Sequence, residues 1–352
     1  MRRNIVALLC AVVLIMTVER HWLVSLRSTS LCFGILRQAG QARALPRLMT
    51  GVEELAAAYK YLTLDQYGVM HDGRNAYPGA ADALSRLKAA GCRALILSNY
   101  AGRALTQRER LRKIGLNPDD LTGPVGVITS GEMAHRYLSA NRQKLGGRVL
   151  WIAWADRAGR GLGDFFEGLE GYSLADRVDA ADFILVSGVE SIFAGTAAET
   201  KATSFERDGD VSPFVDMFRA AVERGLPLLC ANPDVRVMRP WGKGYLGGGL
   251  AESYEAMGGK VLYLGKPHAL AFEEARRMLE ESGLSPADRI CHVGDSLHHD
   301  VAGASAAGFD AAFVIRPGLH ADAFPAEPTA AEIAALCEEV GVPVPVASIS
   351  RF

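Results

Sequence analysis

The sequence lacks several signals that would place it in a familiar class. Its six cysteines are scattered and form no C-x-x-C pair, which argues against a disulfide framework and a thiolate zinc site. Lys plus Arg number 38 against 40 Asp plus Glu, for a net charge of −2. We therefore expect no nucleic-acid partner, because no basic excess exists to attract phosphates. The Gly-x-Ser-x-Gly elbow of serine hydrolases is also absent.

No apolar run reaches the ~20 residues that a membrane-spanning helix needs. The longest, residues 4–18, follows Arg2-Arg3 and has the length of a signal-peptide core. Residues 1–48 hold seven arginines and a single acid, Glu19, which also suits an organelle transit segment. A third interpretation is that the protein starts at Met49. We treat 1–48 as an N-terminal extension and expect a cytoplasmic protein, with a membrane association only if residues 4–18 are retained.

The 352 residues, 49% of them hydrophobic, predict a globular protein of more than one domain. After residue 48, short apolar runs alternate with helix-like stretches, which indicates a parallel sheet covered by helices. The predicted strands are 61–64, 94–97, 149–153, 183–186, 226–230, 261–264, 290–293 and 311–315. The predicted helices are 81–90, 131–140, 213–224, 270–282 and 300–307. The glycine-rich segment 241–250 is predicted to be a loop or linker.

Polar residues follow four of these predicted strands directly. They are Asp65, Ser98 with Asn99, Lys266, and Asp295 with Asp300 five residues later. Ligands bind at the carboxyl ends of strands in doubly wound sheets. Each segment alone is a weak signal, since an Asp at a strand end is often a helix N-cap. Their order along the chain makes the set informative.

In this order the segments resemble the four motifs of the haloacid dehalogenase (HAD) superfamily of aspartate-nucleophile phosphohydrolases. The resemblance extends to subclass IIA, the para-nitrophenyl-phosphatase-like branch, and covers about residues 50–320. The segments that carry it are 65–73, 77–80, 231–234, 265–268 and 294–300. It implies an α/β fold: a Rossmann-like doubly wound parallel sheet with an inserted α/β cap domain.

The resemblance also implies roles for individual residues. Asp65 would attack a phosphoryl group and form an aspartyl-phosphate, which splits the transfer into two easier steps. Ser98 would donate a hydrogen bond to a phosphate oxygen, and Lys266 would supply a fixed positive charge. A Mg²⁺ ion would lie between Asp65 and Asp295, with the backbone carbonyl of Tyr67 as a further ligand. Asp300 would orient a metal-bound water or, alternatively, only cap the following helix.

Tyr67 departs from the family pattern. Most phosphatases of the superfamily carry a second Asp two residues after the nucleophile, where it acts as general acid and base. An unperturbed tyrosine has a pKa of ~10, which does not suit proton transfer near neutral pH. The substitution predicts either a leaving group that needs no proton or another acid nearby, such as His71 or Asp72. It also leaves open a catalytically weakened protein that binds a phosphorylated ligand or a protein partner.

Roughly 160 residues separate Ser98 from Lys266, which is enough for a cap domain. We predict a core formed by 49–104 and 259–352 and a cap formed by 105–258. Asn232 and Asp234, in an Asn-Pro-Asp segment that is also a turn signal, are predicted to face substrate. Arg103 could reach a substrate phosphate or carboxylate, together with Ser98, Asn99 and Lys266. The expected substrate is a small phosphorylated metabolite, and a homodimer through the cap is one arrangement open to such a protein.

Overall fold

We describe a computed structural model of the chain over residues 45–118, 126–201, 204–239 and 241–352. The predictions of a signal, transit or anchor segment within residues 1–44 lie outside the described residues. Among the helices of the described ranges, none is both long enough and apolar enough to span a bilayer.

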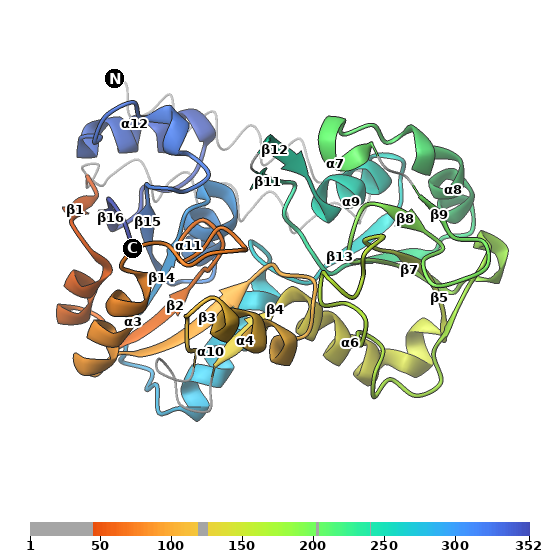
Figure 1. Ribbon diagram of the computed structural model, residues 1–352, viewed down its shortest axis with the longest axis horizontal. Helices are drawn as coiled ribbons and strands as arrows, with labels where there is room; N and C mark the ends of the chain where they lie inside the picture. The colour runs from red at the N-terminus through yellow and green to blue at the C-terminus, as the bar shows by residue number, and fades with distance from the viewer. Residues whose placement is uncertain (1–44, 119–125, 202–203, 240) are drawn as a thin grey trace, which may run out of the picture. The chain divides into compact units, whose positions relative to one another are not determined.

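The first and last parts of the chain share one seven-stranded parallel sheet. Its order is β1-β16-β15-β14-β2-β3-β4, and Figure 1 shows the orange β2 and β3 beside the blue β14 and β15. The strands are Arg47–Met49 (β1), Tyr61–Leu64 (β2), Arg93–Ser98 (β3), Val127–Thr129 (β4), Ile290–Gly294 (β14), Asp310–Val314 (β15) and Ala347–Ile349 (β16). From β2 the chain adds strands in one direction, and from β14 in the other. The β2–β14 pair is therefore the switch point at which such sheets bind ligands.

Both faces of this core sheet are buried, which explains why its strands are continuous apolar runs. Side chains alternate between the faces: Leu62 and Leu64 pack into one apolar cluster, whereas Tyr61 packs into the other. The elements that accompany the sheet are Val52–Ala57 (η1), Ala80–Ala89 (α3), Ala104–Lys113 (α4), Ala269–Glu281 (α10), Leu297–Ala302 (η3, a π-helix), Gly303–Ala306 (α11), Ala321–Ala323 (η4) and Ala330–Val340 (α12).

The middle of the chain forms the cap, around a second parallel sheet of order β13-β10-β7-β5-β6. Its strands are Arg148–Ile152 (β5), Ser173–Leu174 (β6), Phe183–Val186 (β7), Pro227–Cys230 (β10) and Lys260–Tyr263 (β13). Two antiparallel hairpins join Ser191–Ile192 (β8) to Thr200–Lys201 (β9), and Arg236–Arg239 (β11) to Gly242–Tyr245 (β12). The helices are Ser130–Leu145 (α6), Val178–Ala180 (η2), Phe205–Asp208 (α7), Ser212–Glu223 (α8) and Gly247–Ala256 (α9).

The predicted fold class is confirmed, but the sheets move all three predicted boundaries. The first core part does not end at 104, because β4 pairs with β3 and keeps residues up to 129 in the core. The second core part does not begin at 259, because β13 pairs with β10 of the cap. The fold also begins before Met49, since Arg47 and Leu48 belong to β1.

The eight predicted strands all coincide with strands of the structure, and 61–64 and 183–186 match residue for residue. The prediction of a loop or linker at 241–250 was wrong. Its glycines instead lie in strand β12 and in the first turn of helix α9. At Gly248 no larger residue fits, because a Cβ at this position would lie 2.1 Å from the backbone oxygen of Pro233.

Candidate active site

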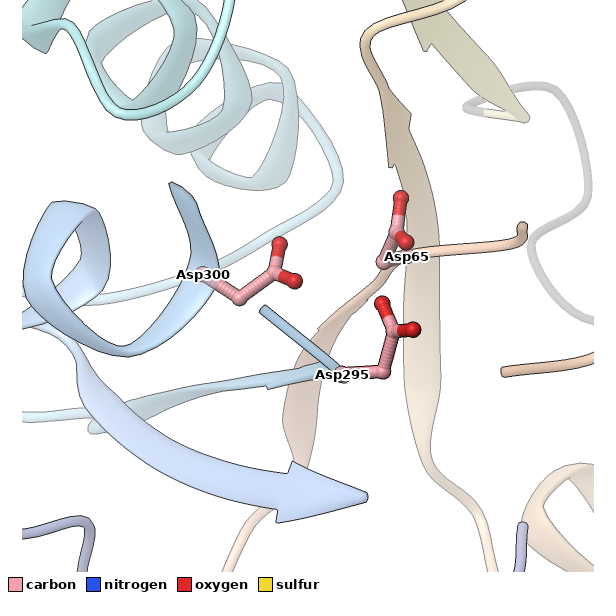
Figure 2. A group of neighbouring side chains, drawn as sticks. All are labelled: Asp65, Asp295 and Asp300. Carbon is pink, nitrogen blue, oxygen red and sulfur yellow. The ribbon is translucent and has the colours of Figure 1, made fainter. Parts of the chain in front are cut away.

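Three carboxylates meet at the switch point of the core sheet. Asp65 directly follows β2, Asp295 directly follows its neighbour β14, and Asp300 lies in the π-helix η3. Figure 2 shows the three side chains converging, and one oxygen of each lies within 4.8 Å of the others. All three residues are buried. The sequence prediction that these residues gather at one sheet edge is met.

Lys266 is the cation of this cluster. Its Nζ lies 2.7 Å from Asp65 Oδ1 and 2.6 Å from Asp300 Oδ1, and the residue is only 2% exposed. Burial acts to lower the pKa of Lys266, but the charges of Asp300 and Asp65 outweigh it and raise the pKa above its usual value. The ammonium group therefore stays charged, as a binding site for phosphate requires.

One positive charge does not balance three carboxylates, and the surplus falls on Asp65 and Asp295. Burial raises the pKa of Asp65 to about 7, and the attraction of Lys266 only partly opposes it. Burial, and then the charges of Asp65 and Asp300, raise the pKa of Asp295 well above its usual value. The raised pKa values mean that the ionised forms of both carboxylates are disfavoured in this cluster. A hard divalent cation bound to their oxygens would stabilise the ionised forms.

Asp300 is held by three donors. Lys266 Nζ and His292 Nε2 both lie within hydrogen-bond distance of its Oδ1, at 2.6 and 2.8 Å, and its Oδ2 accepts a bond from the backbone N–H of Ser296. Burial acts to raise the pKa of Asp300, but Lys266 and His292 hold it below its usual range. The Asp300 carboxylate thus holds Lys266, whereas the N-cap of the π-helix is Ser296.

Ser98 is the last residue of strand β3, which neighbours β2, and Asn99 follows it. The Oγ of Ser98 accepts hydrogen bonds from Gln66 Nε2 and from the backbone N–H of Tyr100, so its own proton remains for another acceptor. The amide of Asn99 accepts from the Lys266 N–H at 2.8 Å and donates to the Lys266 carbonyl at 2.9 Å. Asn99 therefore fixes the backbone that carries Lys266.

A cavity of about 1060 Å³ opens over these groups and is lined by both core and cap residues. Asn232 and Asp234 line it, as predicted. The Oδ1 of Asp234 accepts a bond from Asn99 Nδ2 at 2.8 Å, which links the cap segment to β3. The Oδ1 of Asn232 also accepts a bond from the backbone N–H of Asp234, so the turn and cavity interpretations of this segment hold together.

Arg103 does not line the cavity. Its Nε lies 2.8 Å from Glu132 Oε2, and its terminal nitrogen faces the carbonyl of Glu167. The predicted contact of Arg103 with substrate is therefore wrong, because Glu132 at the start of α6 satisfies the guanidinium.

Two family models match the chain, one from the core into the first part of the cap and one over the last part of the core. The Haloacid dehalogenase-like hydrolase family matches residues 62–158, which include Asp65 and Ser98. The HAD-hydrolase-like family matches residues 263–334, which include Lys266, Asp295 and Asp300. The chain belongs to the HAD superfamily.

Solved structures of similar fold cover most of this HAD protein. A haloacid dehalogenase-like hydrolase from Brucella suis 1330 has 23% identity and a TM-score of 0.67, and the match covers 86% of this chain and 99% of that one. A possible sugar phosphatase from Cytophaga hutchinsonii has 21% identity and a TM-score of 0.65, and the match covers 87% of this chain and 98% of that one. A p-nitrophenyl phosphatase from Archaeoglobus fulgidus has 22% identity and a TM-score of 0.59, and the match covers 83% of this chain and 96% of that one. They confirm the predicted fold, and one of them is named a p-nitrophenyl phosphatase. No curated protein matches the chain.

Tyr67 of this HAD protein points its hydroxyl at the cap. Arg239 of β11 forms a hydrogen bond with it, and burial raises the pKa of Tyr67 against the opposing charge of Arg239. The hydroxyl therefore keeps its proton at neutral pH and cannot act as a base. The Tyr67 carbonyl remains a predicted metal ligand.

The two alternative acids are not suited to the role. His71 accepts a hydrogen bond at Nδ1 from the Gly73 N–H, and burial lowers its pKa to about 4, so it is neutral near pH 7. The Oδ1 of Asp72 accepts bonds from the backbone N–H groups of Arg74 and Asn75. Although partial burial opposes them, these bonds lower the pKa of Asp72. It is a turn residue and stays ionised.

Several residues of the site carry no motif that the sequence analysis used. His292 lies inside an apolar strand, where it reads as core, and only the fold places it against Asp300. Five arginines of the cavity lining also went unnoticed, namely Arg74, Arg110, Arg160, Arg236 and Arg239. Arg236 and Arg239 share strand β11, but the other three lie far from them and from one another in the sequence, so no local pattern groups all five.

Proposed function

We propose that this protein is a magnesium-dependent phosphatase of a small phosphorylated metabolite, and that Asp65 is its nucleophile. The observation that carries the proposal is the buried cluster in which Lys266 bridges Asp65 and Asp300 while Asp295 lies within reach of a shared cation. The names of the similar structures, which include sugar and nitrophenyl phosphatases, support the same class of substrate.

The contacts of Asp65 suit an attack on phosphorus. Its Oδ1 is engaged by Lys266, while its Oδ2 accepts no hydrogen bond within the described ranges. In the proposed reaction Oδ2 forms a bond to phosphorus, the bond to the leaving oxygen breaks, and that oxygen departs with the electron pair. Water then attacks the aspartyl-phosphate, which releases phosphate and restores the carboxylate. Ser98 and Lys266 would bind the phosphate oxygens throughout.

The donor set fits a magnesium ion. Asp65 and Asp295 would hold it, with the Tyr67 carbonyl as the proposed further ligand and Asp300 acting on Lys266 and on bound water. When bound, the ion would neutralise the charge of the transferred phosphoryl group. Hard carboxylate oxygens are the usual ligands of this ion. The raised pKa values of Asp65 and Asp295 support the proposal, because a bound cation would favour the ionised form of both groups.

Tyr67 favours a second candidate function, a weakened protein that binds a phosphorylated ligand without rapid turnover. Removing a general acid typically costs ~10²–10⁴-fold, and neither His71 nor Asp72 supplies a replacement. The two candidates differ in how they depend on the leaving group. An enzyme adapted to its lack of an acid hydrolyses esters of acidic alcohols or phenols, whereas a binding protein turns over neither kind.

The test is release of phosphate from para-nitrophenyl phosphate and from a panel of metabolite phosphates by the full chain. Under the proposal, turnover requires magnesium and disappears in Asp65→Asn and with chelator. A folded protein that binds magnesium but hydrolyses no member of the panel would refute it. In that case Tyr67→Asp should gain turnover by about 10²-fold, while the matched Tyr67→Phe should gain none.

The predicted homodimer, cytoplasmic location and absence of nucleic-acid partners stay predictions. Size-exclusion chromatography with light scattering tests the first. Mass spectrometry of the native N-terminus tests whether residues 4–18 remain in the mature protein.

A further inference from the structure

Five arginines, Arg74, Arg110, Arg160, Arg236 and Arg239, line the cavity beyond the carboxylate cluster. We call them the arginine wall. They come from the loop after β2, from α4, from the loop after β5 and from the β11–β12 hairpin. Arginine is the side chain best suited to bind carboxylates and phosphates, because its planar fork can donate two parallel hydrogen bonds.

Only one member of the arginine wall is neutralised by an ion pair in the described part of the chain. Arg239 lies 2.8 Å from Glu206, whereas the other four have no carboxylate within 4.0 Å among the described residues. Arg160 is half-buried. Burial, and then the charge of Arg239, lower its pKa, and the more distant charges of Glu206 and Glu190 only partly oppose them. A half-buried guanidinium without a partner acid is costly unless a ligand supplies the negative charge.

Arg160 is also held in place before any ligand arrives. Its guanidinium carbon lies 4.1 Å from the centre of the Trp154 ring, and its own carbonyl accepts a 2.6 Å bond from the Tyr100 hydroxyl. Arg110 lies over the Tyr100 ring at 5.3 Å and donates to the carbonyl of Gly159. Aromatic rings and backbone carbonyls thus hold the two guanidiniums in place. Binding an anion therefore costs these side chains little further conformational entropy.

Tyr100 connects this region to the reacting centre. Its backbone N–H donates to Ser98 Oγ, and its hydroxyl reaches the Arg160 carbonyl. Tyr100 therefore links the two places, through its backbone on the side of Ser98 and through its side chain on the side of the Arg160 loop. A single small metabolite can extend between them, and the cavity of about 1060 Å³ exceeds what a two- or three-carbon phosphate would fill.

We propose that the substrate carries a second anionic group, a carboxylate or a phosphate, at the end away from the transferred phosphate, and that Arg160 and Arg110 bind it. This inference rests on the proposed phosphatase function for its reacting end. It narrows the substrate class from any phosphate monoester to a metabolite with two anionic ends.

Binding to the full-length Asp65→Asn protein with magnesium tests the second-anion site without any turnover. Isothermal titration calorimetry compares fructose 1,6-bisphosphate with fructose 6-phosphate, and 4-carboxyphenyl phosphate with phenyl phosphate. We expect the ligand with two anionic ends to bind at least tenfold more tightly in at least one pair. Preference for the bisphosphate alone identifies phosphate as the second anion, and preference for the carboxyphenyl ester alone identifies carboxylate. Equal affinities in both pairs overturn the inference.

Two variants locate the effect. Arg160→Gln should reduce the preference at least tenfold, because it removes the charge and keeps most of the side chain. Arg142→Gln is the matched control, since Arg142 also lies over an aromatic ring, Tyr172, at 5.2 Å but outside the cavity lining. A preference that survives in Arg160→Gln, or that falls equally in Arg142→Gln, refutes the assignment. The ligand pairs decide the matter on the Asp65→Asn protein if Arg160→Gln fails to fold.

Turnover by the wild-type chain separates this inference from the proposed function. Hydrolysis with no preference between the members of either pair would support the phosphatase and overturn the second-anion site. Preferential binding with no hydrolysis of any ester would support the site and refute the phosphatase.

Discussion

Magnesium should stabilise this protein more strongly as the pH rises, because the ion competes with protons for Asp65. Burial raises the pKa of Asp65 to about 7 from its ordinary value of 3.8. In the metal-free protein the proton on Asp65 therefore contributes stability that is lost as pH rises through about 7. A bound cation requires the ionised form. Its affinity should fall about tenfold for each pH unit below 7, because binding must displace this proton.

The magnitude follows from the linkage of binding to folding. Each displaced proton is worth about 1.4 kcal/mol per pH unit. Because Asp65 is half ionised at a pH equal to its pKa, stabilisation at a fixed magnesium concentration should rise by about 2 kcal/mol between pH 5 and pH 7. For a chain of this size that is a difference of roughly 3 °C in Tm. The raised pKa of Asp295 can only make the dependence steeper.

The assay is thermal unfolding with magnesium and with chelator at each pH, and the difference in Tm is the observable. This difference removes the contribution of histidines such as the buried His71 and the half-buried His320. Burial lowers their pKa values to about 4, so they stabilise the metal-free and the magnesium-bound protein equally as pH rises toward 6.5. Asp65→Asn should make the slope shallower, and Asp216→Asn, whose side chain is 98% exposed, should leave it unchanged. A stabilisation that is independent of pH, or a slope in Asp65→Asn as steep as in the wild-type chain, would show that Asp65 does not bind the ion.

Three further substitutions test how the site and the cap are built. Gly68→Ala places a Cβ 2.2 Å from Asp295 Oδ2 at a φ of +82° and should weaken magnesium binding at least tenfold by calorimetry, whereas Gly79→Ala, with φ +86° and no atom within 4 Å, should cost only about 1 kcal/mol of stability; equal affinities would contradict this. Lys266→Met leaves two buried carboxylates without their cation and should cost about 3–5 kcal/mol in denaturant unfolding at pH 8, with a smaller loss at pH 5, where protons replace the lost charge. Phe218→Ala removes a fully buried ring from the cap core and should cost about 3–5 kcal/mol; a loss under 1 kcal/mol would mean that the cap repacks around the space.

The strands were predictable because parallel strands buried on both faces are continuous apolar runs. Residues 61–64 and 183–186 match their strands in full. The domain boundaries were not predictable in the same way. Strand β4 has three residues, too few for a pattern, and β13 resembles any other apolar strand. Only its pairing with β10 assigns it to the cap, and pairing is decided by tertiary contacts that composition does not encode.

The site was predictable where sheet topology alone brings residues together. Asp65 and Asp295 follow neighbouring strands of the core sheet and Ser98 ends the next strand, and parallel strands place such ends at one edge. Lys266 follows β13 of the cap sheet, so sheet topology alone does not bring it to this edge. Prediction failed for Arg103, because the sequence gives no sign that Glu132 satisfies its guanidinium. The arginine wall was not predicted from the sequence for a different reason. Its members come from four elements, and only the approach of cap to core makes them neighbours.

Tyr67 connects the two unusual features of this site. At this position the ring replaces a proton donor, and its hydroxyl binds Arg239 of the arginine wall, which in turn pairs with Glu206 of the cap. One substitution therefore removes the acid that would assist a poor leaving group and adds a core contact to the hairpin that lines the cavity. Catalysis must then rely on positioning and charge, which a substrate anchored by two anionic ends would supply. The missing acid and the surplus arginines are consistent with the same kind of substrate. Its leaving group departs without a proton from the protein, and both of its anionic ends are bound.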